Sequence, residues 1–315
     1  MTDKIVAIVA SISEKIGEIN ATHLYKPSTE LRKKNRIKTI QSSLEIEGNT
    51  LTEEQITALL ENKRVIAPQK DILEVQNAIK VYEQLHVFNP NKMQDLVKAH
   101  AILMNGLIEN AGKLRTGNVG IVKGSKVEHI APNGSMVNGL MKDLFEYLKK
   151  DNELILIKSC VFHYEFEFIH PFQDGNGRMG RLWQTLILIQ QYPVFEFLPI
   201  ESIIKQKQSD YYNKLSESDK KGNSTPFIEF MLEIISESLD ELLQSQSVTH
   251  NTEDRIRLFA SKIGMNRFSR KDYMQHFKNI SAPTASRDLK WAVEQNHLIR
   301  FGELRLTEYQ FTNEK

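Results

Sequence analysis

Residues 170–181 read HPFQDGNGRMGR, a helix end, a polar glycine-rich loop and a helix start in one short stretch. Pro171 disfavours the α region for His170, so we expect a preceding helix to end there with the imidazole facing the loop. The Gly-Asn-Gly turn at 175–177 lets the backbone approach a ligand and leaves N–H groups for phosphate oxygens. A helix that starts after this turn favours an anion at its N-terminus.

The side chains of this stretch also suit a ligand that carries phosphate groups. Asp174 offers a hard oxygen ligand for Mg²⁺. Arg178 and Arg181 are three residues apart and share a helix face, so their guanidinium groups can hold terminal phosphates bidentately. Phe172 is expected to anchor the loop in the apolar interior. Four residues of the following helix are expected to face the core: Met179, Leu182, Trp183 and Leu186.

The sequence pattern over most of the chain predicts α-helix, because apolar residues recur at intervals of three to four residues. One stretch differs: residues 118–132 read NVGIVKGSKVEHIAP, in which two apolar runs flank Lys123–Lys126 and indicate a β-hairpin. The expected helices cover residues 3–18, 29–46, 53–62, 70–86, 91–108, 135–149, 153–169, 177–191, 200–217 and 225–245.

The C-terminal part has a different pattern. The polar segment Gln244–Thr252 is expected to be a linker, and a helix is expected over 254–263. Ser269 and Ser281 are expected to cap two further helices, which end near Phe277 and Gln295. Residues 298–301 and 304–307 flank Gly302-Glu303 and indicate a tight hairpin. Three helices followed by a two-stranded ribbon predict a winged helix-turn-helix.

Composition is that of an ordinary globular protein, with 40% hydrophobic and 26% charged residues and a formal net charge of +1. This balance does not suggest a nucleic-acid coat protein or a membrane-surface protein. Cys160 is the only cysteine, so an intramolecular disulfide is impossible and a reducing compartment is expected. Residues 1–10 lack the order of a secretory signal, and no apolar run reaches membrane-spanning length. We therefore expect a cytoplasmic protein without membrane contact.

Nine positions of residues 170–181 match HPFxDGNGRxxR, and the chain thereby resembles the Fic (filamentation induced by cAMP) family of protein adenylyltransferases. The resemblance extends over roughly residues 20–245. It implies a mainly α fold, a Fic helical bundle with a β-hairpin flap, followed by a small winged helix-turn-helix. The expected domains are an N-terminal helical region (1–110), the catalytic core (111–245) and the winged helix (251–315).

The resemblance also implies a reaction, the transfer of AMP from ATP to a Ser, Thr or Tyr hydroxyl of a target protein. His170 is then the general base, and Asp174 holds Mg²⁺. Self-modification is expected, and a homo-oligomer is left open. The residues implied for nucleotide binding are Gly175, Asn176 and Gly177 at the α- and β-phosphates, and Arg178 and Arg181 at the β/γ end, with Met179 and Gly180 between them.

Residues 43–48 read SLEIEG and match the (S/T)xxxE(G/N) inhibitory motif of many family members. Ser43 and Glu47 are one helical turn apart, on a helix expected over about 29–47, and Gly48 suits the position after a helix end. The resemblance implies that Glu47 pairs with Arg181 and blocks the γ-phosphate pocket. The alternative is an ordinary helix end with a surface glutamate.

Further expectations concern partners. The resemblance implies that a target docks on the flap at 118–131 by adding a strand. Tyr212 and Asn213 resemble the region that closes the adenine pocket, although a polar and aromatic helix face explains them as well. Residues 251–315 hold 12 Lys and Arg against 8 Asp and Glu. Arg287 and Lys290 could meet DNA there, or the domain could serve dimerisation or target docking.

Other interpretations remain open. His163, Glu167 and His170 are spaced for one helix face, and Glu167 with His170 forms a Glu-x-x-His of the di-iron type. Pro171 removes His170 from a regular helical face, however, so a structural role for His163 is favoured. Within the enzyme class, the protein could remove AMP or use another nucleotide. A different class is a DNA-binding regulator that senses a nucleotide without turnover.

Overall fold

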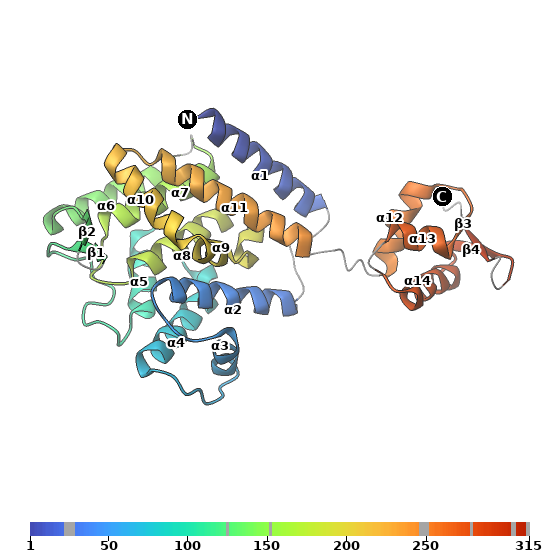
Figure 1. Ribbon diagram of the computed structural model, residues 1–315, viewed down its shortest axis with the longest axis horizontal. Helices are drawn as coiled ribbons and strands as arrows, with labels where there is room; N and C mark the ends of the chain where they lie inside the picture. Colours follow the sequence, from blue (N-terminus) through green and yellow to red (C-terminus); the bar gives the residue numbers. More distant parts are fainter. Residues whose placement is uncertain are drawn as a thin grey trace. The chain divides into compact units, whose positions relative to one another are not determined.

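The computed structural model describes residues 1–21, 29–123, 126–150, 153–245, 252–277, 280–303 and 307–312. The chain divides into two compact units, Met1–Leu242 and Leu243–Lys315. Figure 1 labels the α-helices of both units and most of their strands.

The first unit is a bundle of helices, as expected. The expected helix over 200–217 is in fact two helices, which meet at Lys207. The α-helices are α1 (Asp3–Ala21), α2 (Thr29–Ile46), α3 (Glu53–Leu60), α4 (Gln69–Glu83), α5 (Met93–Leu103), α6 (Val137–Leu148), α7 (Ile155–Ile169), α8 (Asn176–Ile189), α9 (Ile200–Gln206), α10 (Gln208–Lys221) and α11 (Thr225–Ser245). Short 3₁₀ helices are η1 (Leu85–Val87), η2 (Gly134–Met136) and η3 (Pro193–Phe197).

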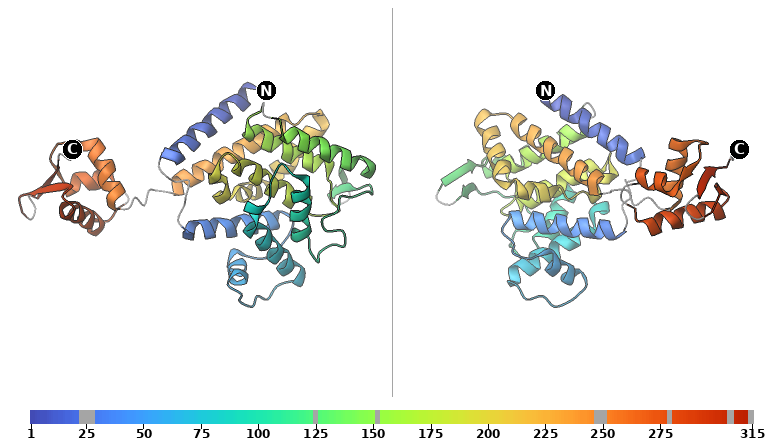
Figure 2. Two further views of the ribbon diagram at one scale, coloured as in Figure 1. Left: turned by 180° about the vertical axis from the view of Figure 1, so that it is seen from behind. Right: turned by 45° about the vertical axis from the view of Figure 1, so that its right-hand side comes forward.

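The core of this unit is built around α7 and α8, which pack against each other inside the bundle. Trp183 of α8 is fully buried and donates its indole N–H to the Pro90 carbonyl at 3.0 Å. The helix α2 packs against α4 and α9, and its Ile40 and Leu44 belong to the same core. Each such buried side chain contributes about 1.5–3 kcal/mol. Figure 2 shows α1 lying along α11, where Lys4 and Glu233 pair at 2.8 Å.

The expected hairpin is present in the first unit. Its strands, β1 (Gly120–Lys123) and β2 (Lys126–Ile130), are antiparallel, and the register shifts between Ile121 and Val122. Residues 124 and 125, at the expected turn, lie outside the described residues.

The second unit has a core of its own, which includes Phe259, Phe268 and Leu289, with Trp291 packed against it. Ser269 and Ser281 cap their helices as expected. Its sheet has the strand order β3-β5-β4. The elements are α12 (Thr252–Ile263), β3 (Phe268–Ser269), α13 (Arg270–His276), α14 (Ala282–Glu294), β4 (Leu298–Phe301) and β5 (Glu308–Phe311).

The C-terminal hairpin differs from the expected one. Its second strand is Glu308–Phe311, with Phe301 opposite Glu308, and Thr307, the one described residue of the strand expected at 304–307, lies outside it. The apolar anchor of this strand is Phe311, which stacks on Phe268 with ring centroids 5.6 Å apart. Residues 304–306 lie outside the described residues. The order of three helices and a hairpin is as expected, and the winged helix-turn-helix class stays a prediction.

The expected linker is shorter than the polar segment that suggested it. Gln244 and Ser245 are still part of α11, and Thr252 already belongs to α12, while 246–251 lie outside the described residues. Among the helices of the described ranges, none has both the length and the apolar character that crossing a bilayer requires.

Candidate active site

The loop after α7 begins with a left-handed residue. The helix ends at Ile169, and His170 has φ 50° and ψ 60°, a conformation that costs a non-glycine residue roughly 1–2 kcal/mol. The expected helix end before Pro171 is therefore confirmed. Phe172 anchors the loop as expected, because it is fully buried and stacks on His100 with ring centroids 3.6 Å apart.

His100 of α5 also supports this loop, and no sequence pattern predicted its role. Its Nδ1 accepts the Gly112 N–H at 2.8 Å, so Nε2 carries the proton and donates to the Asp174 carbonyl at 2.9 Å. The imidazole is fully buried, and burial lowers its pKa from 6.5 to about 4. No motif surrounds His100, and its partner Asp174 is 74 positions away, which is why pattern reasoning missed it.

The Asn176 side chain closes the loop on itself. Its Oδ1 accepts the Phe172 N–H at 2.9 Å and its Nδ2 donates to the Phe172 carbonyl at 3.0 Å. Gly175 has φ 82°, and a Cβ there would lie 2.7 Å from the Met104 sulfur. The Asn176 side chain thus shapes the loop, and the groups left to meet an anion are the backbone N–H groups of the first turn of α8.

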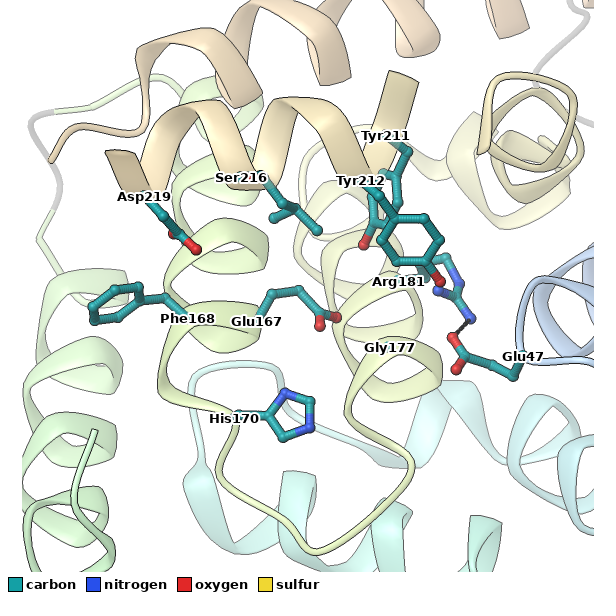
Figure 3. A pocket seen from close by; sticks show the side chains of 11 residues that line it. Glu47, Glu167, Phe168, His170, Gly177, Arg181, Tyr211, Tyr212, Ser216 and Asp219 are labelled. Atoms are coloured by element: carbon teal, nitrogen blue, oxygen red, sulfur yellow. Dashed lines mark hydrogen bonds and ion pairs between the residues drawn. The ribbon is translucent and has the colours of Figure 1, made fainter. Parts of the chain in front are cut away.

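Glu47 and Arg181 form an ion pair between α2 and α8 (Figure 3). Nη2 of Arg181 donates to Glu47 Oε1 at 2.8 Å and to the Ser43 carbonyl at 2.8 Å, and Nε donates to Ser43 Oγ at 3.1 Å. Burial of the guanidinium lowers its pKa, but Glu47, Tyr211 and Glu167 together outweigh this effect, so the pKa of Arg181 is raised. Ser43, Glu47 and Arg181, predicted from motifs far apart in the sequence, therefore lie together.

Gly177 explains how the Glu47 carboxylate comes so close. A Cβ at Gly177 would lie 2.4 Å from Glu47 Oε1 and 3.1 Å from Arg181 Nη1. The carboxylate consequently lies over the first turn of α8, where the helix N-terminus favours an anion. The Glu47 carboxylate therefore occupies a position in which a phosphate group of a ligand could bind both the Arg181 guanidinium and the N–H groups of α8.

A cavity of about 160 Å³ extends from this ion pair. Glu47, Gly177 and Arg181 line one part of it, and His170 lines its wall (Figure 3). Phe168 and Asp219 line a part away from the ion pair. Its volume is below the roughly 300–1,000 Å³ of typical ligand pockets, so the space is small for a whole nucleoside triphosphate while Glu47 is in place.

Arg178 does not line the cavity. It donates to Glu74 Oε1 at 3.3 Å and to Asp174 Oδ1 at 3.2 Å, and it is 5% exposed. Met179 is fully buried in the core, as expected of its side chain. Gly180 faces α7, where a Cβ would lie 2.7 Å from Glu167 Oε1. The assignment of these three residues to nucleotide binding stays a prediction.

Of the two residues of α10 that were predicted to close the adenine pocket, only one lines the cavity. Tyr212 lines the cavity, but Asn213 is exposed and is not among the lining residues. Asp219 lines the cavity instead and accepts a hydrogen bond from the Tyr164 hydroxyl at 2.9 Å. Asp219 follows Tyr212 by seven residues, or two helical turns, so helical spacing was the signal that could have found it.

His163 has protein partners at both ring nitrogens. Nδ1 donates to Gln184 Oε1 at 2.6 Å, and Nε2 accepts the Tyr211 hydroxyl at 3.0 Å. Burial lowers its pKa to about 3. In the described part of the chain, no group of three or more His, Cys, Asp or Glu side chains could hold a metal ion. These contacts support the structural role of His163.

Asp174 lies at the loop surface with 52% of its side chain exposed. Its Oδ1 accepts the Gly175 N–H at 2.6 Å and the Arg178 guanidinium at 3.2 Å. One exposed carboxylate fits Mg²⁺, which proteins usually hold with one or two carboxylates, several waters and the phosphates of a substrate.

Comparison with known proteins identifies the family to which this chain belongs. The family model described as "Fic/DOC family" matches residues 90–188. Protein adenylyltransferase Fic of Nematostella vectensis is 30% identical over 229 residues, 69% of this chain and 51% of that protein. Protein adenylyltransferase fic-1 of Caenorhabditis elegans is 28% identical over 205 residues, 61% of this chain and 38% of that protein. The chain spans about half or less of the length of these curated relatives.

Solved structures extend the likeness to the whole chain. A crystal structure of a Fic family protein from Desulfovibrio desulfuricans G20 has a TM-score of 0.76 and 41% identity, covering 100% of this chain and 98% of that chain. Residues 134–508 of Fic-1 from C. elegans share the fold at a TM-score of 0.64 and 22% identity, covering 78% of this chain and 73% of that chain. The fold is thus that of a Fic helical bundle, and this chain belongs to the Fic family.

Proposed function

We propose that this chain transfers AMP from ATP to a hydroxyl side chain of a protein, itself included, and that Glu47 restrains the reaction. The relatives named protein adenylyltransferase support the chemistry. The observation that carries the proposal is the ion pair of Glu47 and Arg181 over Gly177, in the same cavity as His170.

His170 is the proposed general base. The hydroxyl proton of the target passes to the imidazole, and the hydroxyl oxygen forms a bond to the α-phosphorus of ATP. The bond from that phosphorus to the bridging oxygen breaks, and pyrophosphate leaves. The first turn of α8 and Arg181 would hold the phosphate charges, which orients the nucleotide for in-line attack.

Mg²⁺ is the proposed metal, with Asp174 as its protein ligand. Bound there with the phosphates, Mg²⁺ would neutralise the charge of the leaving pyrophosphate. The Asp174 carboxylate is held near the first turn of α8 by the Gly175 N–H at 2.6 Å and by the Arg178 guanidinium at 3.2 Å. This fixed position supports a metal site that the nucleotide completes.

The restraint follows from competition for one guanidinium. Arg181 is 2% exposed, and its Nη2 is committed to Glu47 and Ser43. A γ-phosphate and Glu47 cannot both hold Arg181 in full, since two anions would then share one buried cation. With Glu47 in place, ATP phosphates would take a pose unsuited to attack, and poor orientation alone can cost several powers of ten in rate.

The experiment compares self-modification in five proteins incubated with α-labelled ATP and Mg²⁺. Glu47→Gly should raise the rate at least tenfold over the wild type, because Arg181 becomes free for the γ-phosphate. Arg181→Ala should stay low, because it removes the restraint and the phosphate clamp together, and Glu47→Gly/Arg181→Ala should resemble it. Glu45→Gln is the control, since Glu45 lies one residue before the end of α2 and pairs with Lys205 instead of Arg181.

Mass spectrometry should find an AMP adduct in Glu47→Gly and none in EDTA. Unlabelled GTP, CTP and UTP as competitors test whether another nucleotide is preferred. If Glu47→Gly and the wild type modify themselves and every tested acceptor at equal rates, Glu47 is an ordinary helix-end residue. Loss of a pre-attached AMP in the wild type would instead favour AMP removal.

We propose DNA as a partner of the second unit. The exposed side of α14 carries Arg287 and Lys290 one turn apart, and residues 251–315 hold 12 Lys and Arg against 8 Asp and Glu. Cationic side chains on a helix surface favour phosphate contacts. Binding of a random duplex that weakens steeply between 50 and 200 mM salt, and weakens further in Arg287→Ala, would support this proposal.

A further inference from the structure

Arg115 is a buried cation that donates four hydrogen bonds to backbone carbonyls. It is 7% exposed and lies in the loop between α5 and β1. Nε donates to the His170 carbonyl at 2.7 Å, and Nη2 donates to the Ile169 carbonyl at 3.0 Å. Two carbonyls that α7 leaves without helical partners at its C-terminal end are thereby satisfied.

The same guanidinium reaches both ends of the β1–β2 hairpin. Nη1 donates to the Gly117 carbonyl and Nη2 to the Pro132 carbonyl, both at 2.7 Å. Gly117 precedes β1 and Pro132 follows β2. One side chain therefore bonds the catalytic loop and both stems of the hairpin.

Neighbouring contacts leave these stems little freedom. The Arg115 N–H donates to the Pro171 carbonyl at 2.9 Å, so its backbone is bonded to the same loop as its side chain. The Gly134 N–H donates to Asn118 Oδ1 at 3.1 Å, which joins one stem to the other. A Cβ at Gly134 would lie 2.1 Å from the Thr116 carbonyl oxygen, so the two stems meet backbone to backbone.

We infer that Arg115 is a positioning residue, which fixes the β1–β2 hairpin relative to His170 and so sets where an incoming hydroxyl lies relative to the base. The inference rests on the proposed transfer reaction. It follows from the four carbonyls, because two belong to the residues at the end of α7 and two to the hairpin stems. If this guanidinium is absent, both parts can still form but their relative position is no longer fixed.

Lysine cannot replace Arg115 in this role. The guanidinium presents five N–H donors in a rigid plane, so it can bond carbonyls on two sides at once. A lysine ammonium is a point charge with three donors on a flexible stem. Arg115→Lys therefore keeps the charge and loses the geometry, which separates positioning from simple charge compensation.

The test uses the full chain in the derepressed Glu47→Gly background, with Arg115→Lys and Arg115→Ala. Self-modification is followed as a function of ATP concentration, and amide exchange is measured by mass spectrometry over residues 116–134. Lys113→Ala is the matched control, because Lys113 is in the same loop but exposed. Arg115→Lys should lower the rate at saturating ATP by about 100-fold, the usual scale for a misplaced reacting group. The half-saturating ATP concentration should stay within about threefold, and exchange over 116–134 should accelerate.

Three results would overturn the inference: an Arg115→Lys rate within about threefold of its parent, a loss seen only in ATP affinity, or faster exchange throughout residues 1–242. If Glu47→Gly itself transfers no AMP, the proposed function fails, and exchange alone decides the role of Arg115. Unchanged exchange over 116–134 in both Arg115 variants would then reject it, and faster exchange confined to that segment would support it.

Discussion

At the scale of single residues, His170 combines a strained backbone with a place in the cavity wall. Its left-handed conformation persists because Arg115 bonds its carbonyl and Phe172 anchors the following residues. Strain held by surrounding contacts is common at sites where a side chain must keep one direction. The direction of the imidazole is thus set by residues that take no part in the chemistry.

We expect His170→Ala to abolish AMP transfer in the Glu47→Gly background while ATP still binds. A missing general base costs roughly 100- to 10,000-fold in rate, whereas the phosphate contacts come from other groups. Adduct formation is measured by mass spectrometry and binding by titration with a non-hydrolysable ATP analogue. His170→Asn is the matched variant, since asparagine tolerates the left-handed backbone. Near-parental transfer by either variant would remove His170 from the mechanism.

His100 should make the first unit sensitive to acid. Its pKa is about 4 in the folded chain and about 6.5 in an unfolded one, so the unfolded state binds more protons between these values. The stabilisation is complete above pH 6.5 and is lost as the pH falls toward 4. Over this window His100 alone should cost about 3 kcal/mol of the free energy of unfolding.

The comparison that isolates this effect is the wild type against His100→Gln, by urea unfolding at pH 7, 5.5 and 4. Glu201 has a pKa raised to about 7 by burial, so its contribution changes with the opposite sign, but it is present in both proteins and cancels. The stability difference between the two proteins should shrink as the pH falls. Parallel curves from pH 7 to pH 4 would mean that His100 titrates normally.

Single residues also show how far the sequence could predict this site. The Glu47–Arg181 pair was predictable because each residue lies in a recognisable local motif. Arg115 and His100 were not, because their partners are backbone carbonyls brought together only by the fold. Asn213 was chosen for its chemistry, whereas the face of α10 that meets the cavity presents Tyr212 and Asp219.

At the scale of elements, α2 is held by its apolar face as well as by the ion pair. Ile40 and Leu44 are at most 2% exposed, so undocking the helix would expose side chains of the main core. Each would cost about 1.5–3 kcal/mol, more than one partly exposed ion pair contributes. In the proposed mechanism, relief of the restraint therefore needs a change of the Glu47 side chain and not release of the helix.

We accordingly expect the amides of residues 37–46 to exchange as slowly in Glu47→Gly as in the wild type. Hydrogen exchange read by mass spectrometry checks this. Leu44→Ala serves as the contrast, because a cavity in the core should destabilise the helix by about 2–5 kcal/mol. Fast exchange of 37–46 in Glu47→Gly would show that the ion pair, and not the core, holds α2 in place.

The positions of the helices were the feature best predicted from the sequence, because helix periodicity depends only on neighbouring residues. The exceptions have a common cause. The break at Lys207 and the late start of β5 are decided by packing, since α9 packs against α2 and Phe311 reaches Phe268. Neither partner is near in the sequence.

At the scale of the molecule, each unit has its own core, and all motif residues belong to the first. Deleting residues 251–315 should therefore leave ATP binding and self-modification of the Glu47→Gly protein within about twofold. Calorimetry should show that one of the unfolding transitions of the full chain disappears. DNA retention, if it occurs, should disappear with the same deletion.

One result would contradict this prediction about the second unit. A shortened chain that folds, as judged by circular dichroism, but no longer binds ATP would mean that the site needs the second unit. Such a result would overturn the assignment of the site to residues 1–242.

The chain has two tryptophans: Trp183 of α8 is buried in the core of the first unit, and Trp291 of α14 packs against the core of the second. Intrinsic fluorescence is therefore divided between the units, and Trp291→Phe would leave an emission that reports on the first unit alone. Because Trp183 is only two residues from Arg181, its emission would report on the helix that carries the Glu47–Arg181 ion pair, without any added dye.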